Sequence, residues 1–403
     1  MTIPNLAKGA EQKGIRILGT GDATQPDWLD HIKKTLHQND GYLEYDSTIF
    51  LPTVEFEDEE SIHHVILLPN LESVDRLRNL VKSDSPNLDD EWGGRPRVNL
   101  GGEEIAGHVR DVGGMIGPAH AFTPFKAIFR ENKHDSLESC YASETENIHF
   151  IELGLSADSE TADYIPELRK LTYITSSDAH SPTPNKLGRE FVQFVMKDPS
   201  FEELKKAIIR NGGRKPTLNL GFNPRLGKYF LSFCSSCRKT LVIKDGDAPP
   251  SFDELNVYFS CKNEEDARNL IDGIHRRKIF CPDCGKKMRL GVRDRARMIG
   301  ELESKKPTHR PPYLYIPPLL DLISTAIGVK STSSKSVRNL YGKIIESMGP
   351  ESSVLTKGSI ELLKEHDERL AKIVHAYRNG DVSYISGGGG RYGKIIAPWE
   401  SQK

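Results

Sequence analysis

Side chains that commonly bind metal ions recur along the first 222 residues, usually directly after a short apolar run. They are histidines and carboxylates, which suit zinc or manganese. Two or three ions held by such a set can activate a water molecule and neutralise a phosphate while its ester is cleaved. The predicted metal ligands are Asp22, Glu55, His63, His64, His120, Glu152, Asp178 and His180. Among them, we assign catalysis to Asp178, Glu55 and His120.

The spacing within this set limits which of these side chains can face the same metal ion. His63 and His64 are adjacent in a predicted strand, where neighbours face opposite ways, so we predict that His64 binds the metal and keep His63 as the alternative. Asp178 and His180 are two residues apart and share one side of an extended segment. Each residue alone has an ordinary structural explanation. One candidate after each strand is difficult to explain without a metal site.

The elements that would position these residues alternate between strands and helices. Short apolar runs predict strands at Ile15–Gly19, Thr48–Leu51, His64–Leu68, Met115–Pro118, Ile148–Leu153 and Leu171–Ser176. Amphipathic stretches predict helices at 5–13, 27–37, 72–82, 102–112 and 201–211. This alternation predicts an α/β fold with a parallel sheet or barrel, in which chemistry gathers at the carboxyl ends of the strands.

Four of the six cysteines form two C-x-x-C pairs. Pairs of this kind, without a secretion signal, favour a metal over disulfides. We predict that Cys234, Cys237, Cys281 and Cys284 bind one structural zinc, because four thiolates leave no position open for water. The 43 residues between the pairs exceed the usual interval and predict an inserted loop. The alternative is two unrelated cysteine pairs.

Charge divides the chain into an acidic and a basic part. Residues 1–222 carry 24 Lys and Arg against 36 Asp and Glu, whereas residues 223–310 carry 19 against 12. This difference favours catalysis in the first part and polyanion binding in the second, although an uneven surface charge without function is the alternative. The predicted nucleic-acid-binding residues are Arg289, Arg293, Arg295, Arg391, Tyr392 and Lys394.

Composition along the chain predicts three domains. They are a phosphoesterase domain at 1–222, a zinc-binding domain at 223–304 and a small helical domain with a Gly-rich tail at 305–403. The basic, proline-rich segment 305–312 reads as a linker, and helices are expected at 317–328, 333–347 and 359–378. Prolines and Asp321 interrupt the apolar stretch at 313–329, so we expect no membrane span and a cytoplasmic protein.

The order of these motifs resembles the polymerase and histidinol phosphatase (PHP) superfamily. Within it, GTGDATQPDW at 19–28, PAHAFTPF at 118–125, SDAHSPTPNKLGRE at 177–190 and GGGGRYG at 387–393 resemble the endonuclease Q branch. The resemblance implies a distorted β/α barrel with up to three metal ions, Zn²⁺, Mn²⁺ or Mg²⁺. It also implies cleavage of DNA, damaged duplex or single strand, 5′ to hypoxanthine, uracil, xanthine or an abasic site. No nucleotide cofactor is expected.

Two departures from that pattern leave alternatives open. The superfamily begins with a strand bearing His-x-His, whereas this sequence begins at what resembles the following helix; we expect the motif to be encoded upstream. Gln25 stands where the branch has histidine. The alternative functions are a small-molecule phosphoesterase of the histidinol-phosphatase type and an inactive nucleic-acid-binding homologue.

Overall fold

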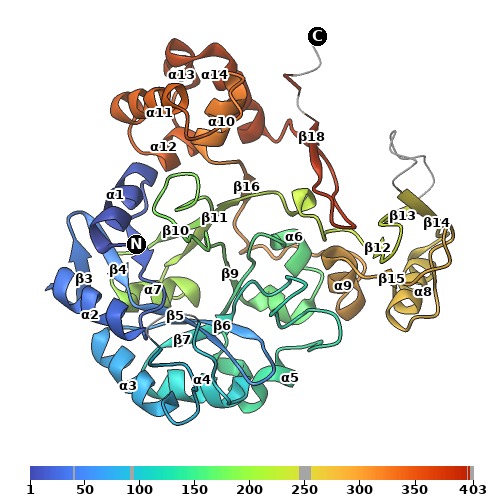
Figure 1. Cartoon of the computed structure of the whole chain (residues 1–403), viewed down its shortest axis with the longest axis horizontal. Helices are drawn as coiled ribbons and strands as arrows, with labels where there is room; N and C mark the ends of the chain where they lie inside the picture. Colours follow the sequence, from blue (N-terminus) through green and yellow to red (C-terminus); the bar gives the residue numbers. More distant parts are fainter. Residues whose placement is uncertain (40, 91–94, 245–255, 397, 400–403) are drawn as a thin grey trace.

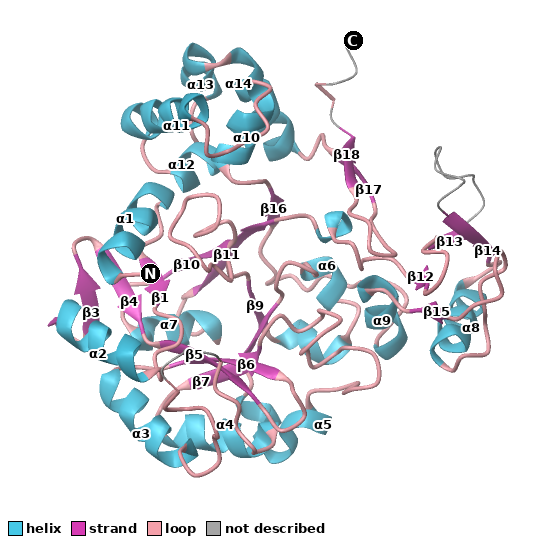
Figure 2. Ribbon diagram, viewed as in Figure 1, coloured by secondary structure: helices cyan, strands magenta, loops and turns pink. Residues whose placement is uncertain are grey.

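The computed structural model describes residues 1–39, 41–90, 95–244, 256–396 and 398–399. Short strands lie within the N-terminal region with helices around them, and a separate group of helices forms much of the C-terminal region (Figure 1, Figure 2). The predicted α/β class and the helical C-terminal region are confirmed. None of the described helices is long and apolar enough to cross a membrane.

Strands of the N-terminal region form several short sheets. The strands are β1 (Ile17–Gly19), β2 (His37–Asn39), β3 (Tyr42–Tyr45), β4 (Thr48–Leu51), β5 (Thr53–Glu57), β6 (His63–Leu67), β7 (Met115–Pro118), β8 (Phe150–Glu152) and β9 (Thr172–Ile174). Their sheet orders are β1-β4-β3-β2, β5-β6-β7 and β8-β9. Each strand predicted from the sequence in this region overlaps an observed one, whereas β2, β3 and β5 are not among the predicted strands.

The strand directions correct one expectation. β1 is parallel to β4 and β8 to β9, but β6 is antiparallel to both β5 and β7. Residues 58–62, which connect β5 to β6, are too few for the crossover that parallel strands require. The expected parallel pairing is therefore wrong for this sheet.

Helices surround these sheets; α7 (Phe201–Ile208) packs into a small core, and the others bury apolar residues in one large core. They are α1 (Ile3–Lys13), α2 (Pro26–Thr35), α3 (Leu71–Val81), α4 (Gly102–Asp111), α5 (Glu138–Tyr141), α6 (Ser159–Ala162) and α7 (Phe201–Ile208). Side-chain caps set several of their starts. Asn70 accepts a hydrogen bond from Ser73 N, and Ser200 accepts one from Glu203 N, which satisfies amides that the helix itself leaves unpaired.

A later part of the chain returns to the N-terminal region. Strand β11 (Lys215–Gly221) pairs with β10 (Phe191–Val195) on one side and with β16 (Tyr313–Tyr315) on the other. Just before β16, Arg310 is 4% exposed and its guanidinium lies 2.9 Å from Asp163 Oδ1. The segment 305–312, whose composition predicts a linker, is therefore anchored to the N-terminal region through Arg310.

The predicted zinc-binding domain, residues 223–304, which we call the zinc region, has a small sheet of its own. Its order is β14-β13-β12-β15, and helices α8 and α9 accompany it. The elements are β12 (Phe233–Cys234), β13 (Thr240–Lys244), β14 (Asn256–Ser260), β15 (Met288–Arg289), α8 (Glu264–His275) and α9 (Val292–Ile299). α9 packs into the core of the N-terminal region through Val292 and Ala296, so the two regions share buried surface.

The C-terminal helices enclose a second large core. They are α10 (Leu319–Ala326), α11 (Lys335–Met348), α12 (Glu351–Thr356), α13 (Ile360–His366) and α14 (Glu368–Asn379). The single helix expected at 359–378 is broken at Asp367, whose carboxylate caps α14 by accepting from Leu370 N. The chain then forms a hairpin of β17 (Ser383–Ile385) and β18 (Lys394–Ile396), and its Gly-rich loop packs against the start of the zinc region (Figure 1).

Candidate active site and metal-binding clusters

An open cavity of about 1990 Å³ lies in the N-terminal region at the ends of its strands. It brings together ligand candidates that are far apart in the sequence and come from the turns and strands of six different elements. The predicted ligands that line it are Asp22, Glu55, His63, His120, Glu152, Asp178 and His180.

Glu55, His63 and His120 form the centre of this group, with ligand atoms within 4.8 Å of one another. His63 Nδ1 lies 2.9 Å from Glu55 Oε1 and 2.9 Å from His120 Nε2. On its other side, His63 Nε2 lies 3.1 Å from Glu57 Oε2, and Glu57 is held in turn by Lys126 Nζ at 2.7 Å. Glu57 thus orients the imidazole, as a carboxylate does behind a metal-binding histidine.

The donor atoms of this trio fit a cation. Glu55 Oε1 is buried and, despite its close neighbours, has no hydrogen-bond partner of good geometry. Arg95 reaches into the same place, with Nε 2.6 Å from Glu55 Oε1 and Nη1 3.3 Å from His63 Nε2. Glu55 thus already pairs with one positive charge, that of Arg95. A carboxylate and two imidazoles in one place are also the ligands of a divalent-metal site.

Electrostatics in the cavity shift the pKa values of two carboxyl groups, Glu55 in the trio and Glu152 beside it, in opposite directions. Burial opposes ionisation of Glu55, but the neighbouring His120, His63 and Arg95 outweigh it and lower the pKa of Glu55 far below its usual value. Burial and the charge of Glu55 raise the pKa of Glu152. Burial tends to lower the pKa of His120, but the Glu55 carboxylate outweighs it and raises that pKa.

The remaining lining residues surround the trio without joining it. Glu152 is 8% exposed and accepts a hydrogen bond from His120 N at 2.8 Å, so it holds the turn that presents His120. The Asp178 and His180 side chains are 63% and 87% exposed, with Asp178 Oδ1 3.4 Å from His180 Nε2. Asp22, also exposed, completes the rim of the cavity.

Backbone conformation marks the same residues. Asp22, His120 and Asp178 have φ angles of 41°, 33° and 44°, in the left-handed region that side chains other than glycine seldom adopt. All three stand in turns that follow strands. Conformations of this kind cost free energy and cluster at functional sites, where the rest of the fold imposes them.

His64 does not face the cavity. It is fully buried, with Nε2 3.0 Å from Asp58 Oδ2 and Nδ1 2.7 Å from the Tyr141 hydroxyl. The alternation along β6 places His63 on the cavity side and His64 in the core. We therefore withdraw His64 from the ligand set. Gln25 has a local structural use as well, because its side-chain oxygen accepts from Trp28 N at 2.5 Å and caps α2.

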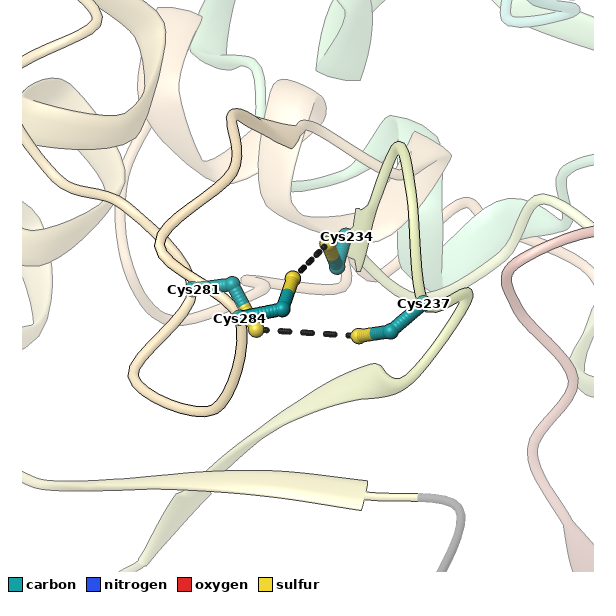
Figure 3. Close-up of side chains that lie close together, drawn as sticks. All are labelled: Cys234, Cys237, Cys281 and Cys284. Carbon is teal, nitrogen blue, oxygen red and sulfur yellow. Dashed lines mark hydrogen bonds between the residues drawn. The ribbon is translucent and has the colours of Figure 1, made fainter.

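The predicted cysteines converge on a second cluster (Figure 3). Cys234 Sγ lies 3.4 Å from Cys284 Sγ, and Cys237 Sγ lies 3.7 Å from Cys281 Sγ. These separations exceed the ~2.0 Å of a disulfide. They are close to the ~3.8 Å that Zn–S bonds of ~2.3 Å give in a tetrahedron. Burial opposes ionisation of Cys234, yet backbone N–H groups of Ser236 and Cys237 lower its pKa to about 7. Burial raises the pKa of Cys237 and of Cys281, so in the absence of a metal ion the thiolate is favoured at Cys234 but not at these two.

The predicted nucleic-acid-binding residues have different surroundings. Arg289 is exposed on β15, and Arg293 Nη2 pairs with Asp294 at 2.9 Å. Arg295 is only 5% exposed and its guanidinium binds Phe129 O at 3.1 Å and Asp135 at 2.6 Å. We withdraw Arg295 from the predicted interface because it fastens α9 to the N-terminal region.

The Gly-rich tail is also explained by packing. Gly387 N donates to Arg225 O at 2.7 Å, and Gly390 N donates to Lys228 O at 3.1 Å. A Cβ at Gly387 or Gly389 would approach backbone atoms to 2.5 or 2.2 Å, so only glycine fits there. The N–H groups of Gly387 and Gly390 are therefore already paired with backbone carbonyls. Beyond them, Tyr392 is 72% exposed and Lys394 is exposed at the start of β18.

Sequence reasoning missed two sets of residues. Arg95 follows a polar segment with no motif, so nothing local indicates that it reaches Glu55. The buried face of α9 could have been found, because Val292, Arg295, Ala296 and Ile299 recur at helical spacing. That pattern predicts that Arg295 points inward, whereas a count of positive charges does not.

The chain is similar over its whole length to two solved structures. It is similar to the lesion-specific endonuclease PfuEndoQ from Pyrococcus furiosus, with 39% identity and a TM-score of 0.85, covering 100% of this chain and 92% of that one. It is similar to endonuclease Q in complex with a 27-mer duplex carrying an abasic lesion at the active site, with 38% identity and a TM-score of 0.82, covering 100% of this chain and 93% of that one.

A further relative shares part of the chain. The MJ0043 protein of Methanocaldococcus jannaschii is 34% identical over 281 residues, which are 68% of this chain and 31% of that protein. The chain therefore spans about a third of the length of that relative. Residues 318–381, the C-terminal helices, match the family of the MJ0043 C-terminal domain.

Proposed function

Because the chain belongs to the endonuclease Q family, we propose that it is a DNA-repair endonuclease that cuts DNA 5′ to hypoxanthine, uracil, xanthine or an abasic site. The observation that carries this proposal is the Glu55–His63–His120 group at an open cavity, in a chain that matches endonuclease Q over its full length. The duplex with an abasic lesion bound by one relative supports DNA as the partner.

Within this proposal, Glu55, His63 and His120 hold a divalent metal ion, Zn²⁺, Mn²⁺ or Mg²⁺, as in a PHP-type site. The other residues lining the cavity, Asp22, Glu152, Asp178 and His180, complete the ligand group. A metal ion bound there would supply an activated water and neutralise charge on the phosphate that is cut. The buried Glu55 Oε1, which Arg95 Nε and His63 Nδ1 approach without good hydrogen-bond geometry, supports this assignment.

The surrounding residues keep the ligands in place and approach the phosphate. Glu57 orients the His63 ring, while Glu152 fixes the turn of His120 through its backbone N–H. Arg95 carries a planar guanidinium at the same cavity, and such a group pairs well with two phosphate oxygens. We therefore assign Arg95 to binding the phosphate of the substrate.

The cysteine cluster has a separate, structural function in this proposal. Zinc held by Cys234, Cys237, Cys281 and Cys284 fixes the two knuckles against β12 and β15. Exposed Arg289 lies on β15 beside them, so the zinc would indirectly hold a cationic group at the DNA backbone.

The test is a nicking assay with matched duplexes. The purified protein is incubated with Mg²⁺, Mn²⁺ or Zn²⁺ and with duplexes that differ only at one position, which holds hypoxanthine, uracil, xanthine, an abasic site or a normal base. We expect one cut on the 5′ side of each lesion and none in the normal duplex. Equal cutting of all duplexes would contradict lesion specificity. Turnover of a phosphomonoester without any nicking would support the phosphatase alternative.

A further inference from the structure

The two most exposed aromatic side chains of the described residues belong to one surface feature. Phe125 is 67% exposed and Tyr392 is 72% exposed. They come from the N-terminal region and from the Gly-rich tail, which are more than half the chain apart in sequence. Between them lie Lys228 and Tyr229, and we call these four residues the aromatic strip.

Ring and cation contacts connect the strip from end to end. The Phe125 and Tyr229 rings meet edge to face, with centroids 6.3 Å apart. Lys228 Nζ lies 5.3 Å from the Tyr229 ring centre and 5.8 Å from that of Tyr392. Gly390 N binds Lys228 O, which ties the loop carrying Tyr392 to the same segment. The strip is thus built by three segments that hold one another in place.

The strip begins at the candidate active site. Phe125 lines the same cavity as the proposed metal ligands. It stands on the loop that also presents His120, where Thr123 Oγ1 lies 3.0 Å from His120 Nδ1 and donates to Phe125 O at 2.7 Å. From this position the strip leads away toward the zinc region and its basic residues.

The chemistry of the strip indicates its partner. Aromatic faces alternating with a cation are how proteins bind single-stranded nucleic acid, since bases stack on rings and phosphates pair with positive charge. Base faces in an intact duplex are covered by their neighbours. A ring at the mouth of the cavity can therefore stack only on a base that has been opened out of the helix.

We propose that the aromatic strip binds unpaired nucleotides of the substrate strand, with Phe125 stacking on the base beside the lesion and Lys228 and Tyr392 following the backbone outward. This inference rests on the proposed function. It adds a positioning surface for the opened strand, distinct from the residues that carry the metal.

The test compares binding of three DNAs with labelled ends: a single strand, an undamaged duplex and the same duplex with an abasic site. We expect Phe125→Ala to weaken binding of the single strand and the abasic duplex about tenfold, the effect of one lost stacking contact. Binding of the undamaged duplex should change little. Phe125→Trp should restore binding, and Phe125→Leu, which is apolar without a ring face, should not.

Controls separate this inference from the proposed endonuclease. Leu362→Ala, an exposed apolar side chain on α13, should bind all three DNAs as the wild type does. If Phe125→Ala and Tyr392→Ala bind single strands like the wild type, the inference is overturned even when the wild type nicks damaged DNA. If they bind single strands poorly but the wild type nicks nothing, the strip stands and the endonuclease proposal falls.

Discussion

The cysteine cluster and the cavity of the N-terminal region are both candidate metal sites, but they are built on opposite plans. The cysteine cluster takes its ligands from two short knuckles, and its four thiols lie within 4.8 Å of one another. The cavity draws on residues from Asp22 to His180, leaves several of them exposed and opens onto a volume of about 1990 Å³. A closed site fixes a fold, whereas an open site leaves room for a substrate and water.

The largest effect should come from breaking the open site alone. Glu55→Gln keeps the shape of the side chain but removes the charge on which His63, His120 and Arg95 converge. We expect nicking of an abasic duplex to fall by about 10² or more, by analogy with the loss of a preorganised electrostatic group. The zinc held by the cysteine cluster should stay as in the wild type. Asp178→Asn should act in the same direction.

Glu72→Gln, on the exposed first turn of α3, is the matched control and should nick normally. Full activity of both Glu55→Gln and Asp178→Asn would remove the cavity from the mechanism.

Removing one ligand of the cysteine cluster, the closed site, should reduce nicking somewhat less than Glu55→Gln does. We expect Cys281→Ser to release the tightly bound zinc, because three thiolates hold it less well than four. The zinc region should then unfold at a lower temperature and DNA affinity should drop about tenfold or more. Metal analysis after dialysis measures the zinc, a melting curve measures the unfolding temperature, and a DNA titration measures the affinity. Cys261→Ser, a cysteine of the same region that lies outside the four-thiol group, should retain the zinc; retention by Cys281→Ser as well would show that the cluster is not a zinc site.

The same contrast explains what the sequence could predict. The cysteine pairs converge as expected because each C-x-x-C knuckle is a local feature. The cavity was predictable only as a set, since residues after successive strands share one end of the fold. The choice between His63 and His64 required the register of β6, which hydrophobic pattern alone left open. Arg95 and Phe125 were missed because their positions depend on tertiary packing.

Two arginines of the zinc region can sharpen the comparison further. Arg289→Ala should weaken binding of every DNA sequence severalfold and reduce the salt slope by about 1, as for one lost phosphate contact. It should not change stability. Arg295→Ala should instead destabilise the protein by about 1–3 kcal/mol, because it leaves the buried Phe129 carbonyl without its partner. Titrations at several salt concentrations and urea unfolding distinguish the two; equal effects on both measurements would contradict the assignment.

The smallest effect concerns Glu190, a buried carboxyl group in the wall of the cavity. Glu190 lines the cavity but is only 2% exposed, and its Oε2 has no hydrogen-bond partner. Burial raises the pKa of Glu190 to about 8, against weaker opposing contributions from the Phe222 N–H group and Arg189. The unfolded chain ionises this carboxyl near pH ~4.3. Between these values the folded state binds the extra proton, so raising the pH lowers stability until the pH passes the folded pKa. From pH 6 to 7 the loss should be about 1 kcal/mol, or a Tm shift of roughly 2 °C.

Glu190→Gln is neutral at every pH and should lack this part of the slope, while Glu72→Gln should follow the wild type. Identical pH dependence of Tm in the wild type and Glu190→Gln would show that Glu190 is ionised in the folded protein and that the wall of the cavity is more hydrated than its burial indicates.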